Sequence, residues 1–206
     1  MWHDIEQNTD EWLELRAGKV TGSACAKIMA NYGKAFGNPA KDLAAVVAVE
    51  QLTGKRAASS SFTNEHMERG HIEEPIARAQ YETQFFTDVK NGGFYDNGAT
   101  GCSPDGLAGD NGVIEIKSAI VSIHYARIKR ASYDPAYKWQ LLFNLRESGR
   151  EWIDFVSYCA DFPPHKRLFV SRLHVGDFSA ELGEIEARLY EFFELVHSIK
   201  KIIADK

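Results

Sequence analysis

Two carboxylates and a lysine lie close together near the middle of the sequence. Asp105 follows a proline, and Glu115 and Lys117 come ten and twelve residues later. Because alternate residues of an extended strand share a face, Glu115 and Lys117 are expected to project together. Turn residues over 109–112 predict a hairpin that brings Asp105 back beside them.

This combination of side chains is suited to metal-dependent cleavage of a phosphodiester. Neighbouring carboxylates repel one another unless a hard cation is bound, and magnesium is held by one or two carboxylates together with water and phosphate oxygens. A lysine beside them can orient or deprotonate the attacking water, or offset charge on the phosphate. The spacing matches the nuclease pattern PD-(D/E)xK, although the same residue types also occur as a solvated ion pair on an edge strand.

The rest of the pattern predicts an α/β protein. Frequent turn residues indicate short strands between residues 85 and 117, and alternation of apolar and polar residues predicts two further strands at 152–158 and 168–175. Helical spacing covers 11–16, 22–30, 40–54, 64–84, 121–131, 135–147 and 181–203. Pro75 lies inside the fourth of these segments, where we expect a kink or a new helix start.

Composition limits the class of protein. The 206 residues are 44% apolar and contain no repeat or linker, which favours a single domain over residues 1–206. No apolar stretch is long enough to span a membrane and no secretory signal opens the chain, so a cytoplasmic protein is expected. The cysteines Cys25, Cys102 and Cys159 are scattered, as expected for reduced thiols that serve packing.

Charge is distributed unevenly along the chain. The formal net charge is -5, yet residues 15–41 contain five basic and no acidic residues, and residues 117–150 contain seven basic and two acidic ones. One surface that faces phosphates and an acidic exterior would produce this pattern, although charge runs are often only solvated faces.

A second candidate site lies near the N-terminus. A helix that begins at Gly22 and Ser23 exposes free backbone amides and the positive end of its dipole, and Gly22 would let an anion approach the backbone. Arg16 could complete a phosphate pocket there. Alternatively, Thr21 or Ser23 is only a helix cap and Arg16 only an ion-pair partner.

Five ordered motifs resemble those of the YqaJ-type viral recombinases, the family of phage lambda exonuclease within the PD-(D/E)xK nucleases. They are Trp12-x-x-x-Arg16-x-Gly18-x-x-Thr21-x-Ser23, Arg69-Gly70-x-x-x-Glu74-x-x-Ala77-Arg78, Ser103-Pro104-Asp105-Gly106-Leu107, Glu115-Ile116-Lys117 and Tyr137-x-x-Gln140. The resemblance spans about residues 10–175 and implies a restriction-endonuclease-like core, with a mixed central β-sheet flanked by helices.

The resemblance also implies roles for individual residues. Asp105, Glu115 and the backbone carbonyl of Ile116 would bind magnesium, and Glu74 would complete a second metal site. Lys117 would serve the nucleophilic water, with Gln140 and Tyr137 in support. Glu73 competes with Glu74 for its role. Arg16, Ser23 and Thr21 would bind the 5'-phosphate of DNA.

By the same resemblance, the chain would be an exonuclease that degrades one strand of linear duplex DNA from its 5' end to mononucleotides, leaving a 3' overhang. It would use two Mg²⁺ ions, which Mn²⁺ could replace, act as a ring-shaped homotrimer on DNA ends, and pass the overhang to a single-strand annealing protein.

Other interpretations stay open. Met67 could be a wedge between terminal base pairs or an ordinary packed residue, and Lys34 could touch the DNA backbone or only water. A structure-specific endonuclease, a Cas4-like nuclease or a noncatalytic DNA-binding protein of the same fold are the alternatives, although a Cas4-like enzyme normally has four cysteines for an iron-sulfur cluster.

Overall fold

The chain forms two β-sheets. The computed structural model describes residues 1–58 and 65–205, with the backbone alone for residues 65–67. The smaller sheet has the order β1 (Trp2–His3), β4 (Phe94–Asp96), β5 (Thr100–Cys102) and β2 (Val20–Thr21). The larger has the order β3 (Val89–Lys90), β6 (Gly106–Ala108), β7 (Gly112–Ser118), β8 (Trp152–Tyr158) and β9 (Leu168–His174).

The larger sheet is mixed. β6 and β7 form an antiparallel hairpin, and the left-handed backbone at Gly109, with φ of 56°, allows its tight turn. β7 and β8 run parallel, with Glu115 opposite Phe155, and β9 returns antiparallel to β8. A parallel pair needs a long crossover connection, which is supplied by the helical segment between residues 121 and 148.

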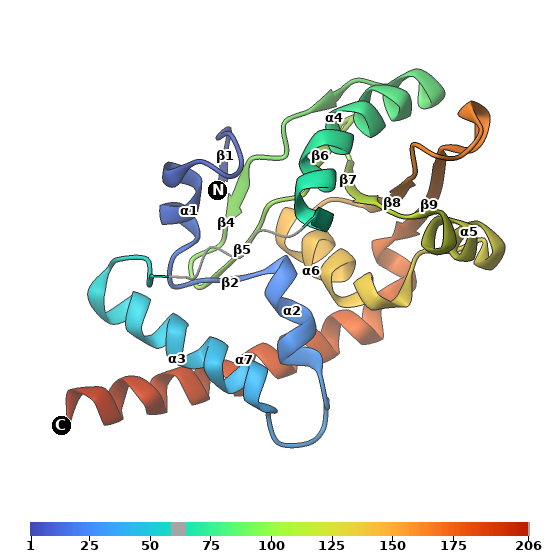
Figure 1. The fold of residues 1–206 in the computed structure, drawn as a ribbon. Coiled ribbons are helices and arrows are strands. Elements are labelled where there is room, and N and C mark those ends of the chain that lie inside the picture. The colour runs from blue at the N-terminus through green and yellow to red at the C-terminus, as the bar shows by residue number, and fades with distance from the viewer. Residues whose placement is uncertain (59–64, 206) are drawn as a thin grey trace.

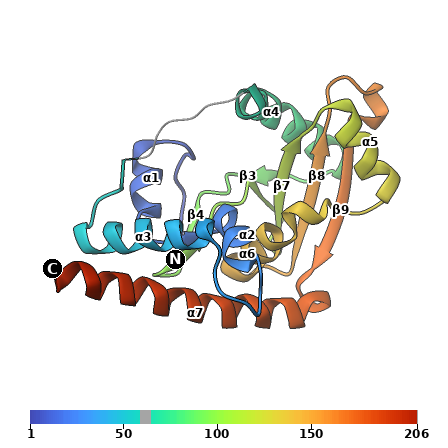
Figure 2. The same ribbon diagram turned by 60° about the horizontal axis from the view of Figure 1, so that its bottom comes forward.

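Helices cover both faces of this sheet (Figures 1 and 2). They are α1 (Asp10–Arg16), α2 (Gly22–Met29), α3 (Asn38–Thr53), α4 (Glu65–Phe85), α5 (Val121–Arg130), α6 (Lys138–Ser148) and α7 (Ser179–Ala204), with short 3-10 turns η1 (Pro135–Tyr137), η2 (Pro164–Lys166) and η3 (Val175–Phe178). The long α7 runs beside α3 along one side of the molecule (Figure 2).

Alternation along β7 creates two hydrophobic cores. Val113 belongs to the larger core, together with buried residues of α2, α3, α6 and α7. Ile114 and Ile116 belong to the smaller core, with Ala77 and Tyr81 of α4. Because successive side chains of a strand alternate between faces, Glu115 and Lys117 lie on the α6 side of the sheet.

The predicted α/β architecture is confirmed, including the mixed sheet and its flanking helices. A new helix start at Pro75 is wrong, since α4 continues through that residue. His71 and Pro75 are both exposed, so water can satisfy the carbonyl that the proline leaves without a donor. Tyr137 belongs to the turn η1, directly before α6.

Two further features of the described residues bear on the protein class. None of the described helices is both long and apolar enough to cross a membrane. The three cysteines are free thiols with buried side chains, as expected for packing residues.

Candidate active site

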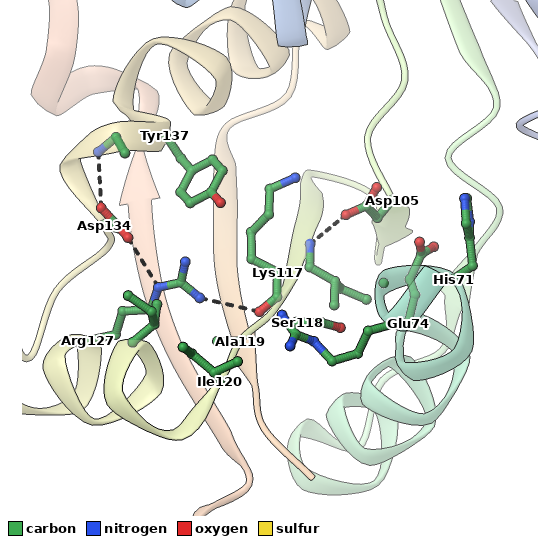
Figure 3. A pocket seen from close by; sticks show the side chains of 15 residues that line it. His71, Glu74, Asp105, Lys117, Ser118, Ala119, Ile120, Arg127, Asp134 and Tyr137 are labelled. Carbon is green, nitrogen blue, oxygen red and sulfur yellow. Dashed lines mark hydrogen bonds and ion pairs between the residues drawn. The ribbon is translucent and has the colours of Figure 1, made fainter. Parts of the chain in front are cut away.

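A cavity of about 770 Å³ opens between α4 on one side and the end of β7 with α5 on the other (Figure 3). Glu74, Asp105 and Lys117 all line it. Glu74 comes from α4, whereas Asp105 and Lys117 come from the β6–β7 hairpin, so the packing of α4 against this hairpin assembles the group.

The β6–β7 hairpin positions Asp105, which directly precedes β6. Its backbone amide donates to the carbonyl of Ile114 at 3.0 Å, and its Oδ2 accepts a hydrogen bond from the amide of Ile116 at 2.6 Å. This bond, drawn in Figure 3, fixes the carboxylate against the strand that carries Glu115 and Lys117.

Glu115 is buried, with 1% of its surface exposed, and helix α6 satisfies most of its hydrogen bonds. Its Oε1 accepts from Lys117 Nζ and Gln140 Nε2, both at 2.5 Å, and its Oε2 accepts from Asn144 Nδ2 at 2.8 Å. Gln140 and Asn144 are one helical turn apart and therefore share a face of α6. Both oxygens of Glu115 are thus oriented by this helix.

Lys117 is held by an aromatic ring as well as by Glu115. Its Nζ lies 5.2 Å from the centroid of the Tyr137 ring, a favourable position for an ammonium group. Arg127 donates to the backbone carbonyl of Lys117 at 3.4 Å and to Asp134 at 3.3 Å. Figure 3 shows this chain of contacts on the α5 side of the cavity.

Glu74 is the α4 glutamate that faces the cavity. Arg78, one turn further along α4, donates to Glu74 at 3.1 Å and to the backbone carbonyl of Asp105 at 2.5 Å. Glu73 instead lies 4.0 Å from Arg69 and does not line the cavity. The geometry therefore favours Glu74 over Glu73 as a partner of Asp105.

The three carboxylates influence one another's ionisation. Burial, followed by the nearby charge of Asp105, raises the pKa of both Glu74 and Glu115 to about 7. Burial also raises the pKa of Asp105 above its ordinary value. For Lys117 burial acts in the opposite direction, but the carboxylates of Glu115 and Asp105 outweigh it and raise its pKa. Additional positive charge in the cavity would therefore favour the ionised form of all three carboxylates.

A divalent cation fits this donor set chemically. Among the described residues no three acidic, histidine or cysteine side chains already stand in a metal-binding arrangement. Lys117 and Arg78 form ion pairs with Glu115 and Glu74. The ligands on offer are carboxylate oxygens that repel one another when ionised, which is the chemistry that Mg²⁺ and Mn²⁺ stabilise.

The second candidate site is built around Arg16. Its guanidinium lies 4.0 Å from the centroid of the Trp12 ring and donates to Ser103 Oγ at 2.9 Å and to Thr21 Oγ1 at 3.2 Å. Burial lowers its pKa to about 10. Within the described part of the chain no carboxylate lies at ion-pair distance from Arg16, so the surface ion pair considered as an alternative is wrong.

Helix α2 begins beside this arginine. Thr21 is its N-cap residue but makes no side-chain capping bond, and Ser23 is exposed. The sequence predicts that Gly22 lets an anion approach the backbone, but in the structure Gly22 allows close packing against Asn144. A Cβ at residue 22 would lie 2.3 Å from Asn144 Oδ1. The glycine lets α2 pack against α6, and Asn144 therefore touches both candidate sites.

The structure adds no support for DNA contacts by Lys34 and Met67. Lys34 is exposed in the loop after α2, and the side chain of Met67 lies outside the described residues. Asn144 and Arg78 are the contributors to which sequence analysis gave no role. The position of Asn144 one turn after Gln140 was a signal that could have identified it, whereas nothing local indicated the contact of Arg78 with Asp105.

Comparison with known proteins identifies the family. The family model described as a YqaJ-like viral recombinase domain matches residues 11–151. The crystal structure of LHK-Exo, an alkaline exonuclease from Laribacter hongkongensis, shares 32% identity and a TM-score of 0.78, covering 96% of this chain and 99% of that one. The complex of LHK-Exo with dAMP gives 33% identity and a TM-score of 0.79 over the same shares.

A phage-related exonuclease from Haemophilus somnus 129PT has the same fold, with 17% identity, a TM-score of 0.63, and coverage of 91% of this chain and 96% of that one. No curated protein sequence matches. The family model covers more than half of the chain, and the LHK-Exo structures match it over nearly its whole length. The chain therefore belongs to the family of YqaJ-like viral recombinase domains.

Proposed function

We propose that this protein is a magnesium-dependent exonuclease that digests one strand of linear duplex DNA in the 5'-to-3' direction. The observation that carries the proposal is the assembly of Glu74, Asp105 and Lys117 around one cavity, with Glu115 hydrogen-bonded behind Lys117. Membership in a family whose solved relatives include alkaline exonucleases supports it.

In this mechanism Asp105, Glu115, Glu74 and the carbonyl of Ile116 would hold two Mg²⁺ ions. The ions supply Lewis-acid stabilisation of the scissile phosphate and a more acidic water, and Mn²⁺ can replace them. Lys117, which donates to Glu115 at 2.5 Å, would orient the attacking water or stabilise negative charge on the phosphate. Gln140 keeps Glu115 in place, and Tyr137 keeps the lysine beside the cavity.

Arg16 gives the proposed enzyme its dependence on DNA ends. Its guanidinium has neutral hydroxyl partners, Thr21 and Ser103, and it lies beside the start of α2, where the N-cap residue Thr21 makes no side-chain capping bond. A terminal 5'-phosphate would add the missing negative charge, with Ser23 at the exposed edge. Held there, the phosphate sets the distance from the strand end to the bond that is cleaved.

The experiment compares linear duplexes with covalently closed circles. Linear DNA labelled at one 5' end and carrying a 5'-phosphate should release labelled mononucleotide when Mg²⁺ is present and none when it is chelated. Asp105→Asn should abolish release while DNA binding persists, and the control Asp110→Asn, in the exposed β6–β7 turn, should behave as wild type. Efficient cutting of closed circles would instead establish an endonuclease, and binding without cutting a noncatalytic DNA-binding protein.

The wider role follows from the same proposal. Digestion of one strand leaves a 3' single strand, which a single-strand annealing protein would receive. Three copies of the chain in a ring would retain the duplex between successive cleavages, with the basic segments 15–41 and 117–150 toward the DNA. Sedimentation of the purified protein tests this trimer directly, because a monomeric or dimeric mass would contradict the ring.

A further inference from the structure

Helix α5 has an inverted distribution of polar and apolar side chains. The residues that it buries are His124, which is fully buried, and Arg127, which is 3% exposed. Of its apolar side chains, Val121 and Ile123 are 49% and 43% exposed, whereas Ile128 is half-buried. Ile120, which caps the helix, is 45% exposed. A surface helix normally buries its apolar stripe, so the outward face of α5 needs another explanation.

Hydrogen bonds, in place of apolar packing, hold the inward face of α5 against the rest of the protein. The two ring nitrogens of His124 lie 2.8 Å from Ser157 Oγ and 2.9 Å from the backbone carbonyl of Lys166. Arg127 donates to the same Ser157 hydroxyl at 3.1 Å. These bonds attach α5 to the sheet, so the fold does not require isoleucines on the other side of the helix.

Two of the outward residues lie in the cavity of the candidate active site. Ile120 and Ile123 line it, beside Ala119 at the end of β7. Figure 3 shows Ile120 and Ala119 on the α5 side, across the cavity from Glu74 and His71 on α4. The cavity therefore has a charged part, where the carboxylates and Lys117 lie, and an apolar wall made by the start of α5.

We propose that Ile120 and Ile123 form a binding wall for the base of the nucleotide whose phosphate is attacked. This inference rests on the proposed function, because that function places a phosphodiester beside Asp105 and Lys117. A nucleotide is charged at its phosphate and apolar on the faces of its base, which matches the two parts of the cavity. The cavity volume, about 770 Å³, is in the range of sites for small organic ligands.

The chemistry of the wall also suits an enzyme that must accept every base in turn. Aliphatic side chains have no hydrogen-bonding groups with which to distinguish base edges, whereas each of the four bases has an apolar face. Contact with Ile120 and Ile123 would therefore add affinity without sequence preference. The groups that bind phosphate would still determine which phosphodiester bond is cleaved.

The test is a binding experiment on the whole protein with Mg²⁺, and it needs no cleavage. Calorimetry compares deoxyadenosine monophosphate with deoxyribose 5-phosphate, which lacks the base, in wild type and in Ile123→Ala. The matched control is Tyr125→Ala, because Tyr125 is on the same helix, is 57% exposed and does not line the cavity. Ile123→Val keeps most of the apolar surface and should restore binding if Ile123→Ala loses it.

We expect Ile123→Ala to weaken binding of the nucleotide about tenfold, the usual effect of truncating an apolar pocket residue, while the base-free ligand changes less than about twofold. Tyr125→Ala should match wild type for both ligands. Equal losses for the two ligands, or no loss, would overturn the proposed wall. A change in oligomeric state on sedimentation of Ile123→Ala would also overturn it, since the wall would then be a subunit contact.

Cleavage assays separate failure of this inference from failure of the proposed function. If wild type cleaves linear duplex and the ligand preference of Ile123→Ala is unchanged, the wall alone is refuted. If wild type binds the nucleotide through the wall but cleaves no DNA, the wall stands and the exonuclease proposal fails.

Discussion

Magnesium binding should stabilise the protein more strongly at alkaline than at acidic pH. Burial and the charge of Asp105 raise the pKa of Glu115 to about 7, so near pH 6 a proton must leave before this carboxylate can bind a cation. For one group with this pKa, the apparent affinity for metal rises about tenfold between pH 6 and pH 8, or about 1.4 kcal/mol. Glu74 acts in the same direction, with a smaller effect because solvent screens its half-exposed side chain.

The free energy of Mg²⁺ binding at each pH determines the expected rise in melting temperature. At a Mg²⁺ concentration about 100 times the dissociation constant at pH 8, binding stabilises the folded state by about 2.7 kcal/mol. At pH 6 the same concentration is only about ten times the dissociation constant, and the gain falls to about 1.4 kcal/mol. For a chain of this length these gains correspond to rises in Tm of about 5–10 °C and about 3–6 °C.

Without metal, the pH dependence should have the opposite sign. A carboxyl group whose pKa is higher in the folded than in the unfolded protein stabilises the fold when protonated. The contribution of Glu115 is complete below its ordinary pKa of 4.5 and is lost as pH rises toward about 7 and beyond. The metal-free Tm should therefore fall between pH 5 and pH 8, in the same range in which the effect of Mg²⁺ grows.

Differential scanning fluorimetry at several pH values, with Mg²⁺ or a chelator, measures both effects. Asp105→Asn should remove most of the Mg²⁺ stabilisation, because it deletes a proposed ligand, and should reduce the metal-free pH dependence, because it deletes a charge that raises the pKa of Glu115 while burial remains. Asp110→Asn should leave both unchanged. A stabilisation by Mg²⁺ that is equal at pH 6 and pH 8, or that survives in Asp105→Asn, would refute the reasoning.

Three further substitutions test other parts of the structure. Arg16→Ala should bring the ratio of kcat/KM for 5'-phosphorylated and 5'-hydroxyl duplexes close to one, and an unchanged ratio would exclude the phosphate pocket. Gly22→Ala should destabilise the fold by about 1–3 kcal/mol in urea unfolding, because its Cβ would collide with Asn144, and a stability equal to wild type would contradict that close approach. Tyr81→Phe should cost about 1–2 kcal/mol, since its hydroxyl donates to buried Asp154 at 2.6 Å, yet it should leave kcat unchanged; a large loss of kcat would show that this network also serves the active site.

Local sequence signals predicted most of the elements because each signal reports a local physical constraint. Thr9 accepts a hydrogen bond from the amide of Trp12 at 3.2 Å, as its position before a helix indicates. Gly54 and Gly149 end α3 and α6 with left-handed backbone, which glycine adopts without strain. Alternation of apolar and polar residues over 152–158 predicted the bounds of β8, because successive side chains of a strand point to opposite faces, although six of its seven residues are buried.

The orientation of elements was harder to predict than their existence. Helical spacing indicated α5, but hydrophobic pattern alone would turn Ile123 toward the core. The structure turns His124 and Arg127 inward instead, because a distant strand offers Ser157 and a distant turn offers a backbone carbonyl as hydrogen-bond partners. Such partners are separated from α5 by about thirty residues or more, so no local pattern contains them.

Helix α6 shows how the two candidate sites depend on each other. Gln140 and Asn144 hold the two oxygens of Glu115, and the side of Asn144 that faces away from Glu115 packs where Gly22 begins α2. The amide of Asn144 can donate to Glu115 only while its oxygen occupies the space that a side chain at residue 22 would fill. A shift of α2 toward α6 at the proposed phosphate pocket would therefore displace Asn144, a hydrogen-bond donor of Glu115, so the geometry of one candidate site depends on that of the other.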